Sequence, residues 1–135
     1  MDWKLELVVI PVSDVDRALT FYAEQLNFTL DVDHRVGEAF RVVQMSPPGS
    51  ACAISFGVGI SPSAPGSTQG LHLVVPDIEA AHAELVEHGV DASKPFHFGA
   101  EGQTEGLHPE RADYGTFLSF SDPDGNGWLV QEVKG

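Results

Sequence analysis

The chain has 135 residues, of which 20 are acidic and 7 are basic, so its formal net charge is −13. A hydrophobic fraction of 42% is typical of a globular domain and too high for a disordered chain. This length fits one compact domain, and the strong negative charge disfavours binding to nucleic acid or to an anionic membrane surface. No apolar run approaches the ~20 residues of a bilayer-spanning helix, and the first residues lack the pattern of a secretion signal, so we expect a cytoplasmic protein.

The first half of the chain predicts one βαβββ module, at about residues 3–60. Residues 3–12 are rich in Leu, Val and Ile and predict a strand, and Asp14 can cap the helix that follows. Apolar residues then recur at helical spacing as far as Leu26, which predicts a helix over 14–26. Alternating and β-branched residues predict three further strands, near 28–34, 39–46 and 51–58.

The second half repeats this order after a polar, proline-containing linker at about 61–69. A short apolar strand at 71–75 precedes Asp77, which caps a helix that stops at Gly89. The segments DVDRA at 14–18 and DIEAA at 77–81 share one pattern, which indicates an internal duplication. Strands are predicted near 93–98, 115–120 and 127–133, with a tight hairpin turn at 122–127. The second module therefore spans about 70–134, within one domain of two pseudo-repeats.

A long glycine-containing segment separates Phe98 from Gly115 and shows little periodicity. A loop of this length in a compact domain is usually a lid or a disordered flap. We favour a lid over a cavity, because Leu107, His108 and Tyr114 supply groups that can contact a ligand.

Three segments, in this order, resemble one known superfamily: PVSDVDRALTFYAEQLNF, VVPDIEAAHAELVEHGV and SFSDPDGNGWLVQEV. They look like the vicinal oxygen chelate superfamily, which includes glyoxalase I, extradiol dioxygenases and bleomycin-resistance proteins. The likeness runs from about residue 4 to 133. It implies an α+β fold in which each module curls its sheet into half a barrel, with the helices outside and a ligand cavity inside. It also implies that two modules close one site, within a chain or across a homodimer.

The resemblance also places the metal ligands that the enzymes of this superfamily use. The corresponding positions here are Leu7, Ser55, Leu71 and Leu129, and these side chains cannot chelate a metal. We therefore expect no metal and no other cofactor. A shift of one residue would bring in His72, but it would also turn that side chain to the opposite face of the sheet, so we expect His72 to be a partly buried structural residue.

The leading hypothesis for function is a metal-independent protein that binds a small molecule, as bleomycin-resistance proteins do. An apolar cavity with a few polar groups suffices for this, and aromatic side chains and the acidic field favour an aromatic or cationic ligand. Phe40, Phe117, Tyr114 and Trp128 can supply flat faces for such a ligand. Core packing is the competing interpretation for each of them, and we favour it for Phe117 and Trp128. The predicted ligand-binding residues are Leu7, Phe40, Ser55, Leu71, Tyr114, Phe117, Leu129 and Gln131.

Two other classes of function stay open. The first is a glyoxalase-like isomerase, lyase or dioxygenase acting on a small substrate, for which His97, His108 and Tyr114 are the weak acid or base candidates. The second is an interaction scaffold whose cavity is collapsed. Metal content separates a metal-dependent enzyme from a binding protein.

Overall fold

The computed structural model describes residues 1–135 and divides into two compact units. Unit 1 comprises Met1–Thr68 together with Asp122–Asn126, and unit 2 comprises Gln69–Ser121 together with Gly127–Gly135. Each unit contains one helical segment and one mixed sheet, in the same order along the chain. The predicted α+β fold of two modules is therefore confirmed. No helix is long and apolar enough to cross a membrane.

Unit 1 contains a four-stranded sheet in the order β1-β4-β3-β2, in which only β1 and β4 run parallel. Helix α1 begins where the Asp14 side chain accepts a hydrogen bond from the Arg17 amide, at 3.0 Å. It continues into the π-helical segment η1, and the chain then turns at Asn27, whose φ is 60°. The elements are β1 Leu7–Val9, α1 Val15–Thr20, η1 Phe21–Gln25, β2 Thr29–Val36, β3 Phe40–Ser46 and β4 Ala53–Val58.

The core of unit 1 lies between this sheet and the helical segment. Val43 pairs with Phe56, and Met45 pairs with Ile54, so all four side chains lie on one face, and all four are buried. The Tyr22 ring lies 5.7 Å from the ring of Phe56, which places the helical segment against this face. The opposite face of the sheet carries the alternate residues.

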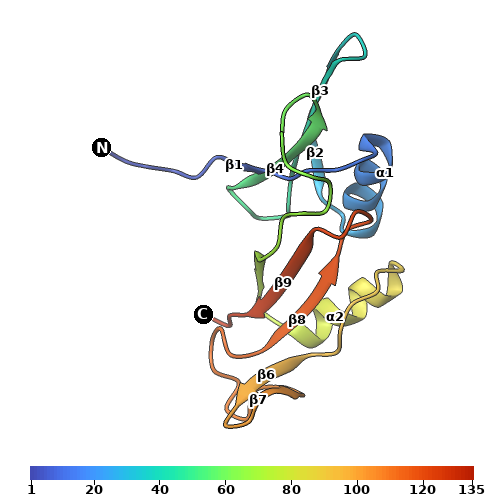
Figure 1. The fold of residues 1–135 in the computed structure, drawn as a ribbon. Coiled ribbons are helices and arrows are strands. Elements are labelled where there is room, and N and C mark those ends of the chain that lie inside the picture. The colour runs from blue at the N-terminus through green and yellow to red at the C-terminus, as the bar shows by residue number, and fades with distance from the viewer. The chain divides into compact units, whose positions relative to one another are not determined.

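Unit 2 contains a five-stranded sheet in the order β5-β9-β8-β6-β7, with helix α2 along one face (Figure 1). Asp77 caps α2 by accepting hydrogen bonds from two amides, and Gly89 ends the helix with a φ of 80°. The core contains Leu118, Phe120, Trp128 and Val130, all buried. The elements are β5 Leu71–Val75, α2 Ile78–Glu87, β6 Phe96–Gly99, β7 Gly102–Glu105, β8 Phe117–Ser121 and β9 Gly127–Glu132.

The segment predicted as one long loop between Phe98 and Gly115 is half β-hairpin. Strands β6 and β7 pair antiparallel from Phe96 with Glu105 to Gly99 with Gly102. Gly102 supplies the positive φ, 97°, that a short turn requires. The long-loop prediction was therefore wrong for this part. Strands β6 and β7 have only four residues each, so the sequence shows no periodic pattern that would identify them. Module two has one strand more than the predicted βαβββ order.

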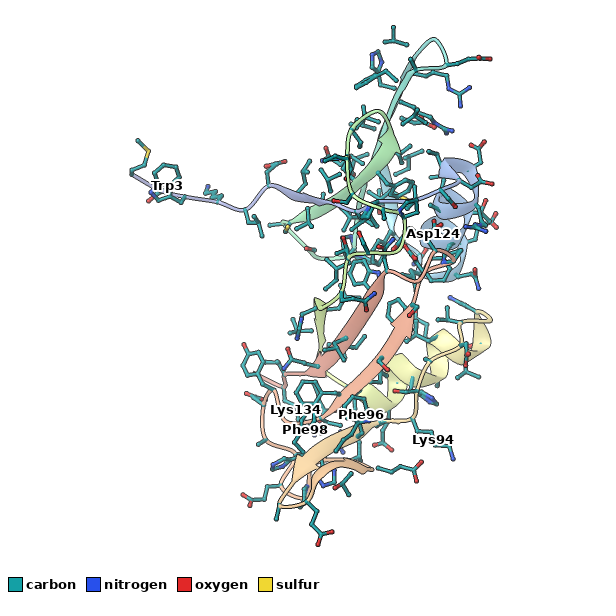
Figure 2. All side chains as sticks on the ribbon, in the orientation of Figure 1. Trp3, Lys94, Phe96, Phe98, Asp124 and Lys134 are labelled. Carbon is teal, nitrogen blue, oxygen red and sulfur yellow. The ribbon has the colours of Figure 1, made fainter.

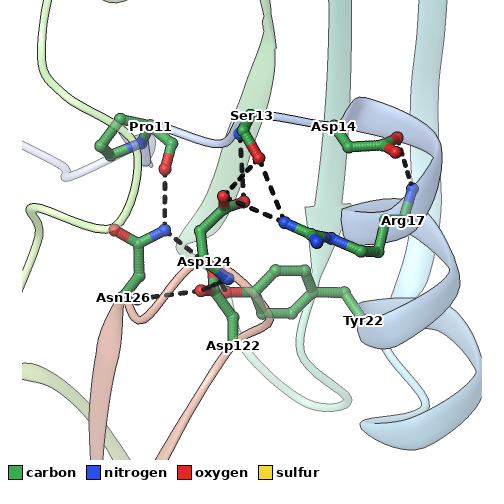
Figure 3. Close-up of polar contacts among 8 residues, drawn as sticks. All are labelled: Pro11, Ser13, Asp14, Arg17, Tyr22, Asp122, Asp124 and Asn126. Carbon is green, nitrogen blue, oxygen red and sulfur yellow. Dashed lines mark hydrogen bonds and ion pairs between the residues drawn. The ribbon is translucent and has the colours of Figure 1, made fainter.

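The turn Asp122–Asn126 joins β8 to β9, as predicted, and its side chains form a buried polar network (Figure 3). The Asp122 carboxylate accepts hydrogen bonds from the Tyr22 hydroxyl at 2.9 Å and from the side-chain amide of Asn126 at 2.8 Å. Asp124 accepts hydrogen bonds from Ser13 and pairs with Arg17, at 3.1 Å. These bonds fix the turn against the start of α1 within unit 1.

A second buried network in unit 2 centres on Glu132, at the end of β9. Its carboxylate accepts a hydrogen bond from the Ile78 amide at 3.0 Å, at the start of α2, and forms a two-point ion pair with Arg111. The Arg111 guanidinium, helped by the Ile78 amide, lowers the pKa of Glu132 to about 2. One carboxylate thus caps a helix and fixes the loop that contains Arg111.

Replacing Tyr22 by Phe removes one hydrogen bond from the buried Asp122 carboxylate. We expect the free energy of unfolding to fall by about 1–2 kcal/mol, because this bond is made to a charged group. Urea unfolding followed by circular dichroism measures the change. The matched control is Tyr114→Phe, whose hydroxyl belongs to an exposed side chain, and an equal loss in both variants would contradict the assignment.

Replacing Glu132 by Gln breaks the buried pair with Arg111. At pH 7 we expect the variant to be less stable by about 3 kcal/mol, because it leaves a charge without its partner. The folded pKa of Glu132 is about 2, below the ordinary value of 4.5, so its stabilisation is complete above pH 4.5 and disappears as the pH falls toward 2. The difference in stability between the two proteins should therefore shrink over that interval.

The control for this experiment is Glu79→Gln, which removes the exposed partner of Arg111 at 3.5 Å. We expect a loss below about 1 kcal/mol, as for other surface pairs. A gap between wild-type and Glu132→Gln that stays constant from pH 6 to pH 2.5 would refute the linkage.

Candidate functional site

The candidate site lies on the face of the unit 2 sheet that is turned away from helix α2. Leu129 pairs with Ser119 on β8 and with His72 on β5, so these three side chains share one face. Trp128 and Val130 alternate with Leu129 and are buried on the helix side. We call the exposed side the open face of unit 2, and it carries His72, Val74, Phe96, Phe98, Phe117, Ser119, Leu129 and Gln131.

Three phenylalanine rings gather at the β6 and β8 end of this open face. Phe96 and Phe117 are paired residues whose rings stack, with centroids 5.7 Å apart and an interplanar angle of 14°. The Phe98 ring meets both of them edge on, at 5.9 Å and 5.3 Å. Phe98 is 60% exposed, and Figure 2 shows it beside Phe96. The cluster therefore presents an aromatic ring to any ligand on this face.

A pocket of about 730 Å³ lies at the ends of β8 and β9 that carry Ser121 and Gly127, and residues of both sheet faces line it. Its volume suits a drug-sized ligand, for which pockets are typically about 300–1,000 Å³. The wall combines hydroxyl, amide and carboxylate groups with apolar surface. The lining residues are Gln69, Gly70, Asp91, Ala92, Ser93, Ser119, Phe120, Ser121, Gly127, Trp128 and Leu129.

Tyr114 stands at the edge of the open face with a strained backbone and an exposed ring. Its amide donates to the Glu132 carbonyl at 2.8 Å, and its carbonyl accepts from the side chain of Gln131 at 3.4 Å. Its φ of 64° costs a non-glycine residue of order 1 kcal/mol or more. The phenol is 59% exposed and makes no hydrogen bond, so packing of the ring does not offset this strain. The ring is thus available to a ligand.

The predicted site residues of unit 1 also share one sheet face. Leu7 pairs with Ala53, which lies two residues before Ser55 on β4, so Leu7 and Ser55 share a face. Ser55 pairs with Gln44, whose neighbours Val43 and Met45 face the helix, so this shared face is the one away from the helix. Phe40 alternates onto the same side and lies 6.4 Å from the His34 ring. Phe40 is 37% exposed, whereas Ser55 is buried.

The prediction for Leu71 requires a correction. Leu71 pairs with Trp128, so its side chain lies on the helix side of the sheet and does not share the face of Leu129. His72 pairs with Leu129, and it is exposed, where we had expected a partly buried residue on the helix side. The spacing carried over from the family was therefore one residue out in β5, and a shift of one residue reverses the face.

The two histidines proposed as weak acid or base candidates lie together, with ring centroids 6.1 Å apart. The His97 Nδ1 lies 2.8 Å from the Gly106 carbonyl, and the His108 Nδ1 accepts a hydrogen bond from the Glu110 amide at 3.1 Å. His97 pairs with Thr104 and alternates with Phe96 and Phe98, so it points away from the open face. The structure does not bring it to the aromatic cluster.

The side chains present do not fit a divalent metal. Leu7, Ser55 and Leu129 offer at most one weak oxygen donor, and His72 adds a single imidazole to the face of Leu129. No group of three or more His, Cys, Asp or Glu side chains gathers as metal ligands would. The sequence did not lead us to predict that Phe96, Phe98 and Ser119 belong to the site. The alternation Phe-His-Phe at 96–98 was the signal that could have found the first two.

Comparison with known proteins agrees with this architecture. The sequence model of the Glyoxalase/Bleomycin resistance protein/Dioxygenase superfamily matches residues 4–130. The uncharacterized protein YetH of Bacillus subtilis (strain 168) is 28% identical over 130 residues, which are 93% of this chain and 94% of YetH.

Solved structures give the same result. TnmS3, an antibiotic binding protein from Streptomyces sp. CB03234, is 29% identical with a TM-score of 0.75, over 98% of this chain and 97% of its own. A superfamily member from Sphaerobacter thermophilus DSM 20745 is 28% identical with a TM-score of 0.70, over 97% of this chain and 98% of its own. The chain therefore belongs to the glyoxalase/bleomycin resistance protein/dioxygenase superfamily.

Proposed function

We propose that this protein binds a small aromatic molecule on the open face of unit 2 and does so without a metal. The observation that carries the proposal is the exposed Phe98 ring, held by Phe96 and Phe117 in the same unit as a pocket of about 730 Å³ that Ser119 and Leu129 of the open face help to line. A rigid aromatic surface and a partly polar pocket on one sheet suit a planar ligand with a few polar groups. The similarity to TnmS3, an antibiotic binding protein, supports a drug-like ligand.

A positive charge on the ligand is the second part of the proposal. Glu105 pairs with Phe96 across β6 and β7, so its carboxylate lies on the same face as the aromatic cluster. Its only ion-pair partner is Lys94 at 4.0 Å, and both side chains are largely exposed. The net charge of −13 adds a long-range attraction for cations. An aromatic cation therefore gains from both stacking and charge.

We also propose a homodimer, as the resemblance implies, and the cavity closes either within one chain or across that dimer. The enzymatic alternative draws no support from His97, because its side chain points away from the open face. The open face offers aromatic rings, hydroxyl groups and one imidazole, that of His72, whose Nδ1 lies 2.6 Å from the Gly70 carbonyl.

Binding is tested with a panel of planar antibiotics, each compared with an uncharged or anionic analogue of the same ring system. We expect the cationic members to raise the melting temperature, and Phe98→Ala to weaken the best binder by about tenfold, since a stacked ring contributes on the order of 1 kcal/mol or more. Isothermal titration measures the affinities. The comparison variant Phe40→Ala removes a similar ring from the predicted site residues of unit 1, and an equal or larger loss there would argue against the open face of unit 2.

Metal content is a separate test of the proposal. After dialysis against Ni²⁺, Zn²⁺, Mn²⁺ and Fe²⁺ in turn, we expect mass spectrometry to find far less than one equivalent of metal per chain, because Leu7, Ser55 and Leu129 are poor ligands and the single imidazole of His72 is too few for a metal site. One tightly held equivalent would instead favour a metal-dependent enzyme.

A further inference from the structure

The first six residues form an extended arm that makes little contact with the rest of unit 1. Trp3 is 88% exposed and Leu5 is 71% exposed, and Figure 2 shows Trp3 far out along the chain. We propose that this arm pairs antiparallel with the same arm of a second copy of the chain, in a register centred on Leu5. The inference rests on the homodimer proposed above and names the surface that forms it.

The sequence of the arm is that of a strand. Every odd position from Met1 to Val9 is apolar, whereas Asp2, Lys4 and Glu6 are charged. This strict alternation is typical of a strand with one buried face. We predicted a strand over 3–12, yet only Leu7–Val9 is paired in the structure. The pattern therefore continues for five residues before Glu6, whose carbonyl is the first group of the chain that bonds to β4.

The backbone directions show which edge is free. The Glu6 carbonyl accepts from the Ala53 amide at 2.9 Å, and the Ile10 amide donates to the Ser55 carbonyl at 2.8 Å, so even-numbered residues face β4. Successive residues alternate, and the amides and carbonyls of the odd-numbered residues therefore point to the outer edge of β1, which is the end strand of its sheet. The Pro11 carbonyl already accepts from the Gly66 amide and Asn126, so the free edge ends before it.

Charge selects the partner and the register. An antiparallel pair centred on Leu5 places Lys4 opposite Glu6 of the partner subunit, twice by symmetry. A register centred on Lys4 would instead place the Lys4 side chains of the two copies opposite each other. It would also place Asp2 of one copy opposite Glu6 of the other. The Leu5 centre also makes the odd residues the hydrogen-bonded pairs, as the free edge requires. Because two chains of charge −13 repel each other, a self-complementary arm is a means of association that this chain carries itself.

A charge-swap cycle tests the register. Light scattering after size exclusion should give a dimeric mass for the wild-type full chain. We expect Lys4→Glu and Glu6→Lys each to raise the dimer dissociation constant roughly tenfold or more, since each variant creates two like-charge oppositions. The double variant Lys4→Glu/Glu6→Lys should restore the wild-type mass. The arm lies outside the core, so all variants should keep the wild-type melting temperature at low protein concentration.

Each other outcome counts against the inference. A monomeric wild-type would overturn both the arm and the homodimer, while the antibiotic titrations still decide ligand binding separately. Dimers that tolerate both single charge variants would place the interface elsewhere. Loss of dimer in Lys4→Glu alone would indicate a register centred on Trp3, with Asp2 as the partner of Lys4, and would overturn the Leu5 centre.

A cross-link gives an independent check. In a Cys52→Ser background, Leu5→Cys places two thiols opposite each other with Cα atoms about 5.5 Å apart, within reach of a disulfide. Mild oxidation should therefore convert most of the protein to a covalent dimer. The matched control Asp2→Cys separates the two thiols by roughly 20 Å in this register and should stay largely uncross-linked. Equal cross-linking in both variants would overturn the proposed register.

Discussion

Side-chain alternation across the two sheets is the constraint on which the site depends. In each unit a helical segment covers one face of the sheet, so alternate residues are committed to the core and the others remain on the open face. Val43 and Met45 are buried on the helix side of unit 1, and Trp128 and Val130 are buried on the helix side of unit 2. Whether a strand residue can contact a ligand therefore depends on whether its position along the strand is odd or even, because this decides which face its side chain joins.

Two buried carboxylates fix segments that lie outside the strands, namely the β8–β9 turn and the loop that contains Arg111. Asp122 collects hydrogen bonds from Tyr22 and Asn126 and so fixes the β8–β9 turn within unit 1. Glu132 joins the start of α2 to Arg111, and its carbonyl also holds the Tyr114 amide. The strained backbone of Tyr114 is kept in place by these neighbours, and its ring is left exposed. The contacts of Glu132 thus hold the backbone of this loop, while the Tyr114 ring remains free to contact a ligand.

The superfamily supports both enzymes and binding proteins, and the difference lies in a few side chains on a common frame. At the first and last strand positions this chain has Leu7 and Leu129. Leu129 adds apolar surface to the open face of unit 2, which also carries Phe117.

Much of the fold was predictable from local signals, because capping and turn formation depend on neighbouring residues. Asp14 and Asp77 marked the helix starts, and the segment from Asp122 to Gly127 marked the last hairpin. The β6–β7 hairpin was missed, since strands of four residues show too little periodicity. The face of Leu71 was assigned wrongly for a different reason. Parity depends on the register with β9, and an error of one residue in a spacing reverses it.

The sequence by itself determined the order of most helices and strands, the residues that cap the helices, and the repetition of the module. These properties are set by residue type and by short-range spacing. Only the tertiary structure decided which side chains meet: the cluster of Phe96, Phe98 and Phe117, and the ion pair between Arg111 and Glu132. Such contacts join residues that are far apart in the chain, and strand register and loop position, which local patterns do not encode, bring them together.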